Sequence, residues 1–362
     1  MTAPRLKVLH VVRQYDPSTG GLETYVSELA TRQSAHFDVA VLTLDRVFGS
    51  DDRLPPLERK QGFPVFRIPF RGGRRLFVPY VPRKLLAAYD VIHIHAADQL
   101  LDVIAAMSVM RPAKMFMTTH GLFFHTRTLA RVKAVYLRTI TRWALGRMKA
   151  VFAVSGNDAA TLRAVGVDTV LLRNPIVPLG DFICEGRDLI YVGRISANKR
   201  VDALVEFMAA LRETDPDVRL HLVGGDGEGL WAGLAERVKA LGLEERVLYH
   251  GFLKTEALRD LARTCGYTVS ASRYEGFGLS VIEGMSVGLL PLMHENEAFR
   301  ETHALSGSGR LTNFDDPAQA ARDFSAWAPT VTRDDREAAA RFARAQTWDA
   351  VCAVYEQHYR AA

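Results

Sequence analysis

Two glutamates that bracket a glycine-rich turn have the spacing most suggestive of chemistry in this chain. The turn, Gly276-Phe277-Gly278-Leu279, follows an apolar, strand-like run at 267–271 and leads into a helical pattern. The first backbone N–H groups of a helix lack an internal partner, and with the helix dipole they form a phosphate site. Carboxylates facing a phosphate would repel it, so Glu275 and Glu283 fit better as acceptors for hydroxyl groups on either side, a ribose and a second sugar. The pattern predicts a nucleotide-sugar site. The alternative is an ordinary strand-turn-helix unit with two solvated glutamates.

A second turn carries positive charge. Arg194 and Lys199 follow the strand expected at Asp188–Val192. Open α/β sheets bind their ligands just outside the carboxyl ends of the strands. The planar guanidinium of Arg194 and the point charge of Lys199 together suit a diphosphate. The alternative is that both are solvated loop cations.

Three further strand ends in the first half could face a ligand. Gly20-Gly21 opens the first helix, where N–H groups can meet a phosphate, although two glycines can also serve turn geometry alone. His120 could donate a hydrogen bond to a sugar or stabilise a departing diphosphate, or it could be structural. Ser155 could line the same edge or cap a helix.

These residues must be positioned by strands that alternate with helices. The expected strands are 7–12, 38–43, 65–68, 91–95, 115–119 and 150–155 in the first half, and 188–192, 219–223, 247–250, 267–271 and 289–293 in the second. The expected helices include 21–33, 129–148, 201–212 and 336–359. Such alternation favours parallel sheets with crossover helices. A linker rich in Pro and Gly at 174–186 separates two Rossmann-like domains, at 1–175 and 187–340.

Length and composition agree with this organisation. The chain has 362 residues, 48% hydrophobic and 24% charged, as expected for a soluble globular protein of two domains. It contains no apolar run of the roughly 18 residues that a membrane span needs, and no apolar signal-peptide core at its start. Its three cysteines, Cys184, Cys265 and Cys352, are scattered and predict reduced cytosolic thiols.

The charge is unevenly distributed. Residues 1–180 carry 25 Lys and Arg against 13 Asp and Glu, whereas residues 181–362 carry 21 against 28. The first half is therefore expected to meet something anionic. The basic residues of an amphipathic helix there, with apolar Val, Ile and Trp between them, are Arg127, Arg131, Lys133, Arg138 and Arg142. We expect this patch and the aromatic-rich segment 71–80 to contact anionic lipid head groups at the inner face of the cell membrane. No nucleic-acid-binding motif is visible, and an ordinary solvated helix is the alternative.

Nothing in the sequence calls for a metal or another cofactor. Asp215-Pro216-Asp217 lies in a polar turn and is interpreted as turn chemistry. His93 and His95 alternate in an apolar strand without companions at ligand spacing.

The motif Glu-x7-Glu with Gly-Phe-Gly inside it resembles the donor site of the retaining glycosyltransferases of family 4. Those enzymes have the GT-B fold, two facing Rossmann-like domains with a C-terminal helix, here about 340–362, that crosses back onto the first. The resemblance implies that Glu283 binds ribose hydroxyls and Glu275 lies beside the transferred sugar. It also matches Arg194 and Lys199 to a diphosphate motif and His120 to a catalytic histidine. Two departures are Gly284, where the family usually has Ala, and Arg200, where it has Gly.

Segments 10–21, 42–48 and 119–126 are similar to bacterial α-1,3-mannosyltransferases of xanthan- and acetan-type exopolysaccharide assembly. This resemblance implies a GDP-mannose donor and a lipid-linked oligosaccharide acceptor, cellobiosyl-diphosphopolyprenol, at the cytoplasmic membrane face. The rival interpretations are a family 4 transferase with a UDP-sugar donor and another acceptor, and a catalytically silent binding or scaffold subunit.

Overall fold

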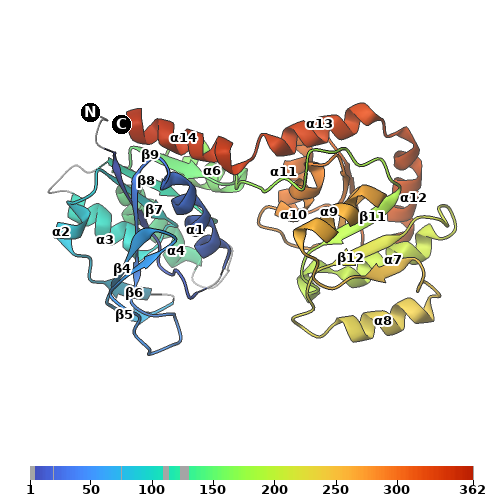
Figure 1. The fold of residues 1–362 in the computed structure, drawn as a ribbon, viewed down its shortest axis with the longest axis horizontal. Coiled ribbons are helices and arrows are strands. Elements are labelled where there is room, and N and C mark those ends of the chain that lie inside the picture. Colours follow the sequence, from blue (N-terminus) through green and yellow to red (C-terminus); the bar gives the residue numbers. More distant parts are fainter. Residues whose placement is uncertain (1–4, 19, 75, 109–113, 123–129, 362) are drawn as a thin grey trace. The chain divides into compact units, whose positions relative to one another are not determined.

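The computed structural model describes residues 5–18, 20–74, 76–108, 114–122 and 130–361, and the chain divides into two compact units (Figure 1). Unit 1 comprises residues 1–173 together with 349–362. Unit 2 comprises residues 174–348.

Unit 1 is built on an eight-stranded sheet with the order β10-β9-β8-β7-β1-β2-β4-β3. Its strands are β1 (Lys7–Val11), β2 (Asp38–Leu44), β3 (Leu57–Lys60), β4 (Phe63–Ile68), β7 (Val91–His95), β8 (Lys114–Thr118), β9 (Ala150–Ala153) and β10 (Val170–Leu171). All neighbours pair in parallel except the edge strand β3. The central strands are almost wholly buried and mostly apolar because helices cover both faces of a sheet of this kind. The strand order reverses between β1 and β7, which makes this the topological switch point of unit 1.

The helices of unit 1 are α1 (Gly21–Gln33), α2 (Arg83–Leu86), α3 (Gln99–Met107), α4 (Ala130–Tyr136), a π-helical turn (Leu137–Thr141), α5 (Arg142–Leu145), α6 (Gly156–Arg163) and α14 (Trp348–Ala361, in this unit from Asp349). A separate antiparallel hairpin is formed by β5 (Phe70–Gly73) and β6 (Leu76–Pro79).

Unit 2 repeats the same topology with an all-parallel sheet of order β13-β12-β11-β14-β15-β16. Its strands are β11 (Asp188–Val192), β12 (Leu220–Val223), β13 (Val247–Tyr249), β14 (Cys265–Ser270), β15 (Leu290–His294) and β16 (Arg310–Thr312). The helical segments are a 3-10 turn (Ala197–Lys199), α7 (Val201–Leu211), α8 (Trp231–Ala240), α9 (Thr255–Thr264), α10 (Leu279–Met285), α11 (Glu297–Ser306), α12 (Pro317–Trp327), a second 3-10 turn (Ala328–Thr330) and α13 (Arg333–Arg344). The switch point of this sheet lies between β11 and β14.

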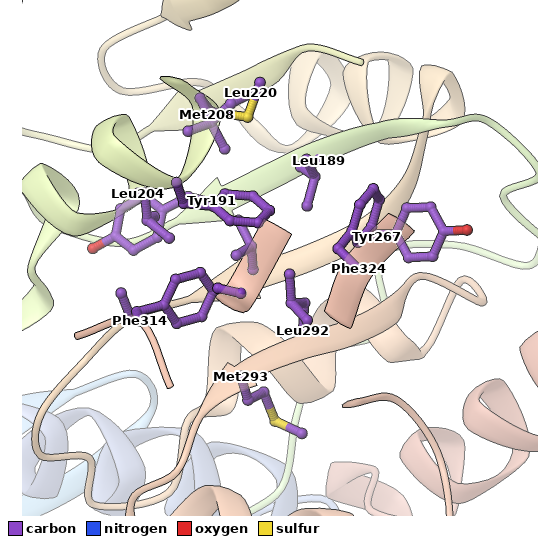
Figure 2. Packing of buried hydrophobic residues seen from close by; sticks show 14 of the residues in the cluster. Leu189, Tyr191, Leu204, Met208, Leu220, Tyr267, Leu292, Met293, Phe314 and Phe324 are labelled. Carbon is purple, nitrogen blue, oxygen red and sulfur yellow. The ribbon is translucent and has the colours of Figure 1, made fainter. Parts of the chain in front are cut away.

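A hydrophobic cluster fixes the position of those central strands. Figure 2 shows strand residues such as Leu189 and Leu292 packed against Leu204 of α7 and Phe324 of α12. Each is at most 1% exposed, and burying a side chain of this size stabilises the fold by about 1.5–3 kcal/mol. The turns that follow β11 and β14 therefore leave a rigid base.

The C-terminal helix α14 packs on the sheet of unit 1 (Figure 1). The ring of Tyr355 packs edge-on against Phe152 of β9, and the ring of Tyr359 lies 5.1 Å from that of Phe116 in β8. The single helix expected over 336–359 is two helices in the structure. Residues 345–347 interrupt it because the chain there bonds to the linker: Ile176 donates its N–H to the carbonyl of Gln346 and forms a parallel bridge with Thr347.

Two other features depart from the sequence-based expectation. The helix expected over 129–148 contains a π-helical turn, and the structure describes it from Ala130. The hairpin β5–β6 and the short strands β3, β10 and β16 were not anticipated. The three cysteines are free and buried, and burial raises the pKa of each thiol to about 12.

Candidate active site

The sheet of unit 2 brings two predicted site residues into contact. β11 and β14 are neighbours, so the turns after their carboxyl ends lie side by side. The ammonium group of Lys199 lies 2.5 Å from a carboxylate oxygen of Glu275 in a largely buried ion pair. Asn198 ties the same turns together, since its amide donates to the carbonyl of Tyr274 and its own carbonyl accepts from the N–H of Arg273.

Arg194 stands at the same strand end without such a restraint on its side chain. It is exposed, and its guanidinium makes no ion pair or hydrogen bond to any residue that the structure describes. Its main chain is held, because the hydroxyl of Tyr191 donates to the Arg194 carbonyl at 2.8 Å. The result is a free planar donor on the same strand-end turn as Lys199, which suits an anionic ligand.

Arg200 adopts the conformation of the glycine that the family has at this position. Its φ is +53°, in the left-handed region, and it ends the 3-10 turn that carries Lys199. A non-glycine residue there costs about 1–2 kcal/mol. The guanidinium of Arg200 bonds the carboxylate of Asp315 at 2.6 Å. The turn therefore keeps the geometry that a glycine would give.

The glycine-rich turn 276–279 ends at a position that only glycine fits. Gly278 has a φ of +67° and precedes α10, and a β-carbon on it would lie 2.5 Å from the ring of Phe299. Gly276 and Leu279 are exposed, while Phe277 is partly buried. Further along α10, a β-carbon on Gly284 would lie 3.2 Å from Thr268 of β14, so a small residue lets the helix approach the sheet.

Glu283 lies one turn into α10 and is partly buried. Burial raises the pKa of its carboxyl group from 4.5 to about 7. The carboxyl group bonds to no residue in the described part of the chain. A carboxyl group held away from water without a partner is suited to accept hydrogen bonds from ligand hydroxyls, because those bonds would offset its lost hydration.

In unit 1, His120 follows β8 in a strained backbone conformation. Its φ is +53°, and Ala96, which follows the neighbouring strand β7, also has a positive φ of +82°. Strain of this kind persists only where the surroundings hold it, and it concentrates at functional sites.

Asp158 of α6 holds the loop around His120. Its carboxylate accepts hydrogen bonds from the hydroxyl of Thr119 at 2.5 Å and from the N–H groups of Gly121 and Leu122 at 3.2 and 3.1 Å. The residue is 3% exposed. Sequence reasoning missed this role, although an acid in the first turn of a helix that follows a strand was an available signal.

The ring of His120 is held by two elements of unit 1. Its Nε2 lies 3.1 Å from Nδ1 of His95 in β7, and its edge packs against Tyr25 of α1 at 4.5 Å between ring centres. Burial lowers the pKa of His120 to about 3, so the ring is neutral near pH 7. The hydroxyl of Tyr25 in turn lies 2.8 Å from that of Tyr355 in α14.

His10, His93 and His95 form a buried cluster on β1 and β7. All three are at most 1% exposed, and their ring nitrogens lie close enough together for a metal ion to be considered. Each nitrogen, however, is already within hydrogen-bonding distance of another group. Those groups are Gln33, Thr118, His120, Tyr359 and one another. The cluster is therefore a hydrogen-bond network, and burial lowers the pKa of all three rings.

The remaining predicted positions in unit 1 are helix starts. Ser155 caps α6, because its hydroxyl accepts from the N–H of Asp158 at 3.1 Å. Gly20 precedes α1 in an extended conformation and Gly21 begins the helix, both exposed. A β-carbon on Gly20 would meet the carboxylate of Glu23, while the space around Gly21 is open.

The basic helix presents an exposed apolar face. Val132, Val135, Ile140 and Trp143 are 61, 62, 46 and 45% exposed. A π turn takes more residues than an α turn, which lets the five-residue step from Val135 to Ile140 return to one side. Arg138 and Arg142 are exposed one turn apart. Arg127 lies outside the described residues, as do the side chains of Arg131 and Lys133.

The β5–β6 hairpin and this helix both pack against α3. On the hairpin, Leu76, Val78 and Tyr80 are 71, 60 and 57% exposed, whereas Phe77 between them is buried. No helix in the described part of the chain is long and apolar enough to cross a membrane.

Each half of the sequence matches a known family, and the two matched segments correspond to the two units. Residues 19–178 match the family described as Glycosyltransferase Family 4, and residues 184–344 match Glycosyl transferases group 1. Over 98% of its length the chain is 31% identical to a protein of Komagataeibacter xylinus, of which it covers 93%. That relative is named GDP-mannose:cellobiosyl-diphosphopolyprenol alpha-mannosyltransferase. A protein of Xanthomonas campestris with the same name is also 31% identical, with 99% of this chain and 97% of the relative covered.

This chain belongs to glycosyltransferase family 4. Solved structures agree with the fold of the transferase. HepE of Anabaena in complex with UDP superposes with a TM-score of 0.71 at 16% identity, with 99% of this chain and all of HepE covered. A glycosyltransferase of Rickettsia africae gives 0.73 at 16% identity, covering 99% of this chain and 98% of that one. The expected GT-B fold is thereby confirmed.

Proposed function

We propose that this transferase moves α-mannose from GDP-mannose to a polyprenyl-diphosphate-linked oligosaccharide of the cellobiosyl type, with retention of configuration, in exopolysaccharide synthesis. The observation that supports this most is the 31% identity to relatives of that name over nearly the whole of both chains. The match includes unit 1 as well as the nucleotide-sugar motifs of unit 2, so it bears on the acceptor and not only on the donor.

The charged turns of unit 2 would act on the diphosphate. Arg194 is a free guanidinium, and Lys199 can exchange part of its contact with Glu275 for a phosphate oxygen. The N–H groups at the start of α10 lack helical partners and add further donors. As the bond between the anomeric carbon and the diphosphate breaks, negative charge grows on the departing GDP. Donors already in place stabilise that charge more than they stabilise the bound substrate, and this difference lowers the barrier.

The two glutamates would act on the sugars. Glu275 would support the positive charge that develops at the anomeric carbon. Glu283 would accept hydrogen bonds from the ribose hydroxyls. His120 of unit 1 would contribute a hydrogen bond to the transferred sugar, as the family resemblance implies.

The surface of unit 1 would meet the membrane that carries the acceptor. Exposed Val132, Val135 and Trp143 beside Arg138 and Arg142 match the composition of segments that lie in the interface of anionic bilayers. Sedimentation with vesicles tests this. Binding to phosphatidylglycerol vesicles should fall with rising salt and with Trp143→Ser, and equal binding to neutral phosphatidylcholine would contradict the electrostatic part.

The test of the whole proposal is transfer from radiolabelled GDP-mannose, UDP-glucose and UDP-N-acetylglucosamine to lipid-linked cellobiose. We expect label only from GDP-mannose, lost in Glu275→Ala and kept in Glu256→Ala, a matched change at an exposed position on α9. Transfer from a UDP-sugar would overturn the donor. Silence with all three donors would overturn the acceptor or favour a non-catalytic role.

A further inference from the structure

We propose that His95, His10 and Gln33 form a positioning chain that fixes which nitrogen of His120 carries the proton. The chain holds His120 as the Nε2–H tautomer and leaves its Nδ1 as a hydrogen-bond acceptor toward the ligand. This role for His120 rests on the proposed function, whereas the direction of the chain does not.

Four side chains from three elements and one loop make a single row of hydrogen bonds inside unit 1. Oε1 of Gln33 in α1 lies 3.0 Å from Nε2 of His10 in β1. Nδ1 of His10 lies 3.0 Å from Nε2 of His95 in β7. Nδ1 of His95 lies 3.1 Å from Nε2 of His120. The row spans the switch point, where β1 and β7 are adjacent and parallel.

The direction of this row follows from its first member. A neutral imidazole has one N–H donor and one bare acceptor nitrogen. The Gln33 amide is oriented with its oxygen toward His10, and its buried Nε2 has no hydrogen-bond partner among the described residues. In this orientation Gln33 accepts, so His10 donates from Nε2 and its Nδ1 is bare. His95 must then donate from Nε2 to His10 and accept at Nδ1, and His120 donates from Nε2 to His95. The proton of His120 is thus used inside the protein, and its Nδ1 is bare.

Burial keeps every ring in the row neutral, so each ring has one donor and one acceptor nitrogen. His10 and His95 are at most 1% exposed, and desolvation lowers the pKa of both rings. A carboxylate at the inner end could take up a proton and turn the row into a path for proton transfer. An amide cannot, so Gln33 makes the row a fixed set of donors and acceptors.

The chemical consequence concerns what His120 can bind. Nδ1 of His120 makes no hydrogen bond to any residue that the structure describes, and the side chain is only partly buried. A bare nitrogen accepts from a hydroxyl group, so the ligand group we assign to it is a sugar hydroxyl and not a phosphate oxygen. Because the acceptor nitrogen is already oriented before the ligand binds, no entropy is lost in orienting it during the reaction.

Nitrogen-15 NMR of the full chain with labelled histidine measures the tautomer of His120 directly, without substrate. His120→Gln assigns the signal. We expect the Nε2–H form in the natural sequence and in His95→Asn, whose side-chain oxygen can replace Nδ1 of His95 as acceptor. In Gln33→Met and His95→Leu we expect both tautomers of His120, because nothing then sets the direction.

His93→Leu is the matched control. His93 lies on the same strand and is equally buried, but it bonds Tyr359 and Thr118 instead of the row. It should lower the thermal midpoint as His95→Leu does, yet leave the tautomer of His120 unchanged. If a leucine variant fails to fold, Gln33→Met and His95→Asn still report the direction.

Transfer kinetics supply the second readout. His95→Leu should lower kcat roughly 10- to 100-fold, more than it raises KM, while His95→Asn should stay within about threefold. An Nδ1–H tautomer in the natural sequence would overturn the proposal, because it corresponds to Gln33 with its amide reversed. So would an Nε2–H form that survives both Gln33→Met and His95→Leu. Absence of mannose transfer would count against the proposed function alone, since the NMR result does not depend on it.

Discussion

The two units have the same strand order around their switch points but hold opposite kinds of chemistry there. In unit 1 the residues are neutral and joined by hydrogen bonds: His10 of β1 and His95 of β7, which are buried, and, at the next strand end, His120, which is partly buried. In unit 2 the residues after β11 and β14 are charged and partly exposed: Arg194 and the Lys199–Glu275 pair. The strand order determines where on each sheet a ligand can bind. The side chains at that position determine which chemical groups can be bound there.

Under the proposed function, this difference would correspond to the two parts of a nucleotide-sugar reaction. A diphosphate is best met by mobile or exposed cations, because it brings its own charge into the site. A sugar hydroxyl is best met by a fixed neutral donor or acceptor, because its hydrogen bonds are directional. We therefore expect changes of charge to matter most in unit 2 and changes of hydrogen-bond direction to matter most in unit 1.

Lowering the pH should produce the largest difference in stability between the two units. The pKa of His10 falls from 6.5 to about 4 on folding, and those of His93 and His95 fall as well. The unfolded chain therefore binds more protons below pH 6.5, and the stability of unit 1 is lost as the pH falls. For His10 alone the loss at pH 5 is roughly 2 kcal/mol as an upper value. Asp98, whose pKa burial raises to about 7, opposes part of it.

Glu283 gives unit 2 a contribution of the opposite sign, part of which is offset because burial lowers the pKa values of His250 and His294. Its pKa is raised to about 7, so the folded state binds more protons between pH 4.5 and 7, and acid relieves a penalty present at neutral pH. Hydrogen exchange, corrected for intrinsic rates, should show protection falling in β7 but not in β14 between pH 7.5 and 5. In Glu283→Gln, β14 should gain protection at pH 7.5. Equal loss in both units would remove this distinction.

Removing the charge of Glu275 without changing its shape should give the next largest effect. Glu275→Gln should lower transfer roughly 10²- to 10³-fold, about 3–4 kcal/mol in barrier. GDP binding, measured by calorimetry, should be unchanged or tighter because Lys199 loses its partner. Glu256→Gln on exposed α9 is the control. A decrease in transfer of tenfold or less would mean that the charge of Glu275 is not the main contribution of unit 2 to the reaction.

Neutralising Asp158 should weaken unit 1 by a smaller amount. Asp158→Asn places an amide group against donors that now face a carboxylate, and hydrogen bonds to charged groups contribute about 1.5–3 kcal/mol. We expect the free energy of unfolding of unit 1, measured in urea, to fall by about 2 kcal/mol. The loop at 119–122 should also lose protection against hydrogen exchange. Asp168→Asn, at an exposed position of the same unit, should have no such effect. Matching midpoints for the two variants would show that the clamp does not hold His120.

The charged cluster of unit 2 was predictable from sequence because it depends on local order. Apolar runs mark the strands, and Arg194, Lys199 and Glu275 each follow a strand directly. Once those strands are adjacent, contact between Lys199 and Glu275 follows. The short strand Leu57–Lys60 could not be recognised, because it is an edge strand without an apolar run.

The histidine row was not predicted because it depends on which strands become neighbours. His10 and His95 are 85 residues apart and meet only through pairing of β1 with β7. A signal did exist: residues two apart on a strand share a face, so His93 and His95 on an apolar strand required buried partners. The pair was interpreted only with respect to metal binding, and its partners are other side chains of unit 1.

Replacing Arg200 by glycine should give the smallest effect. The substitution tests whether the strained backbone of unit 2 is held by its surroundings as that of unit 1 is. His120 and Arg200 both have a φ of +53°, but His120 is held by a buried carboxylate and a ring contact, and Arg200 by one ion pair to a half-exposed Asp315. Arg200→Gly removes about 1 kcal/mol or more of backbone strain and loses an ion pair of similar value. The free energy of unfolding should therefore change by less than about 1 kcal/mol. The affinity for GDP should be unchanged. A larger loss would show that the Arg200–Asp315 pair holds the Lys199 turn, so that unit 2 also depends on a fixed contact.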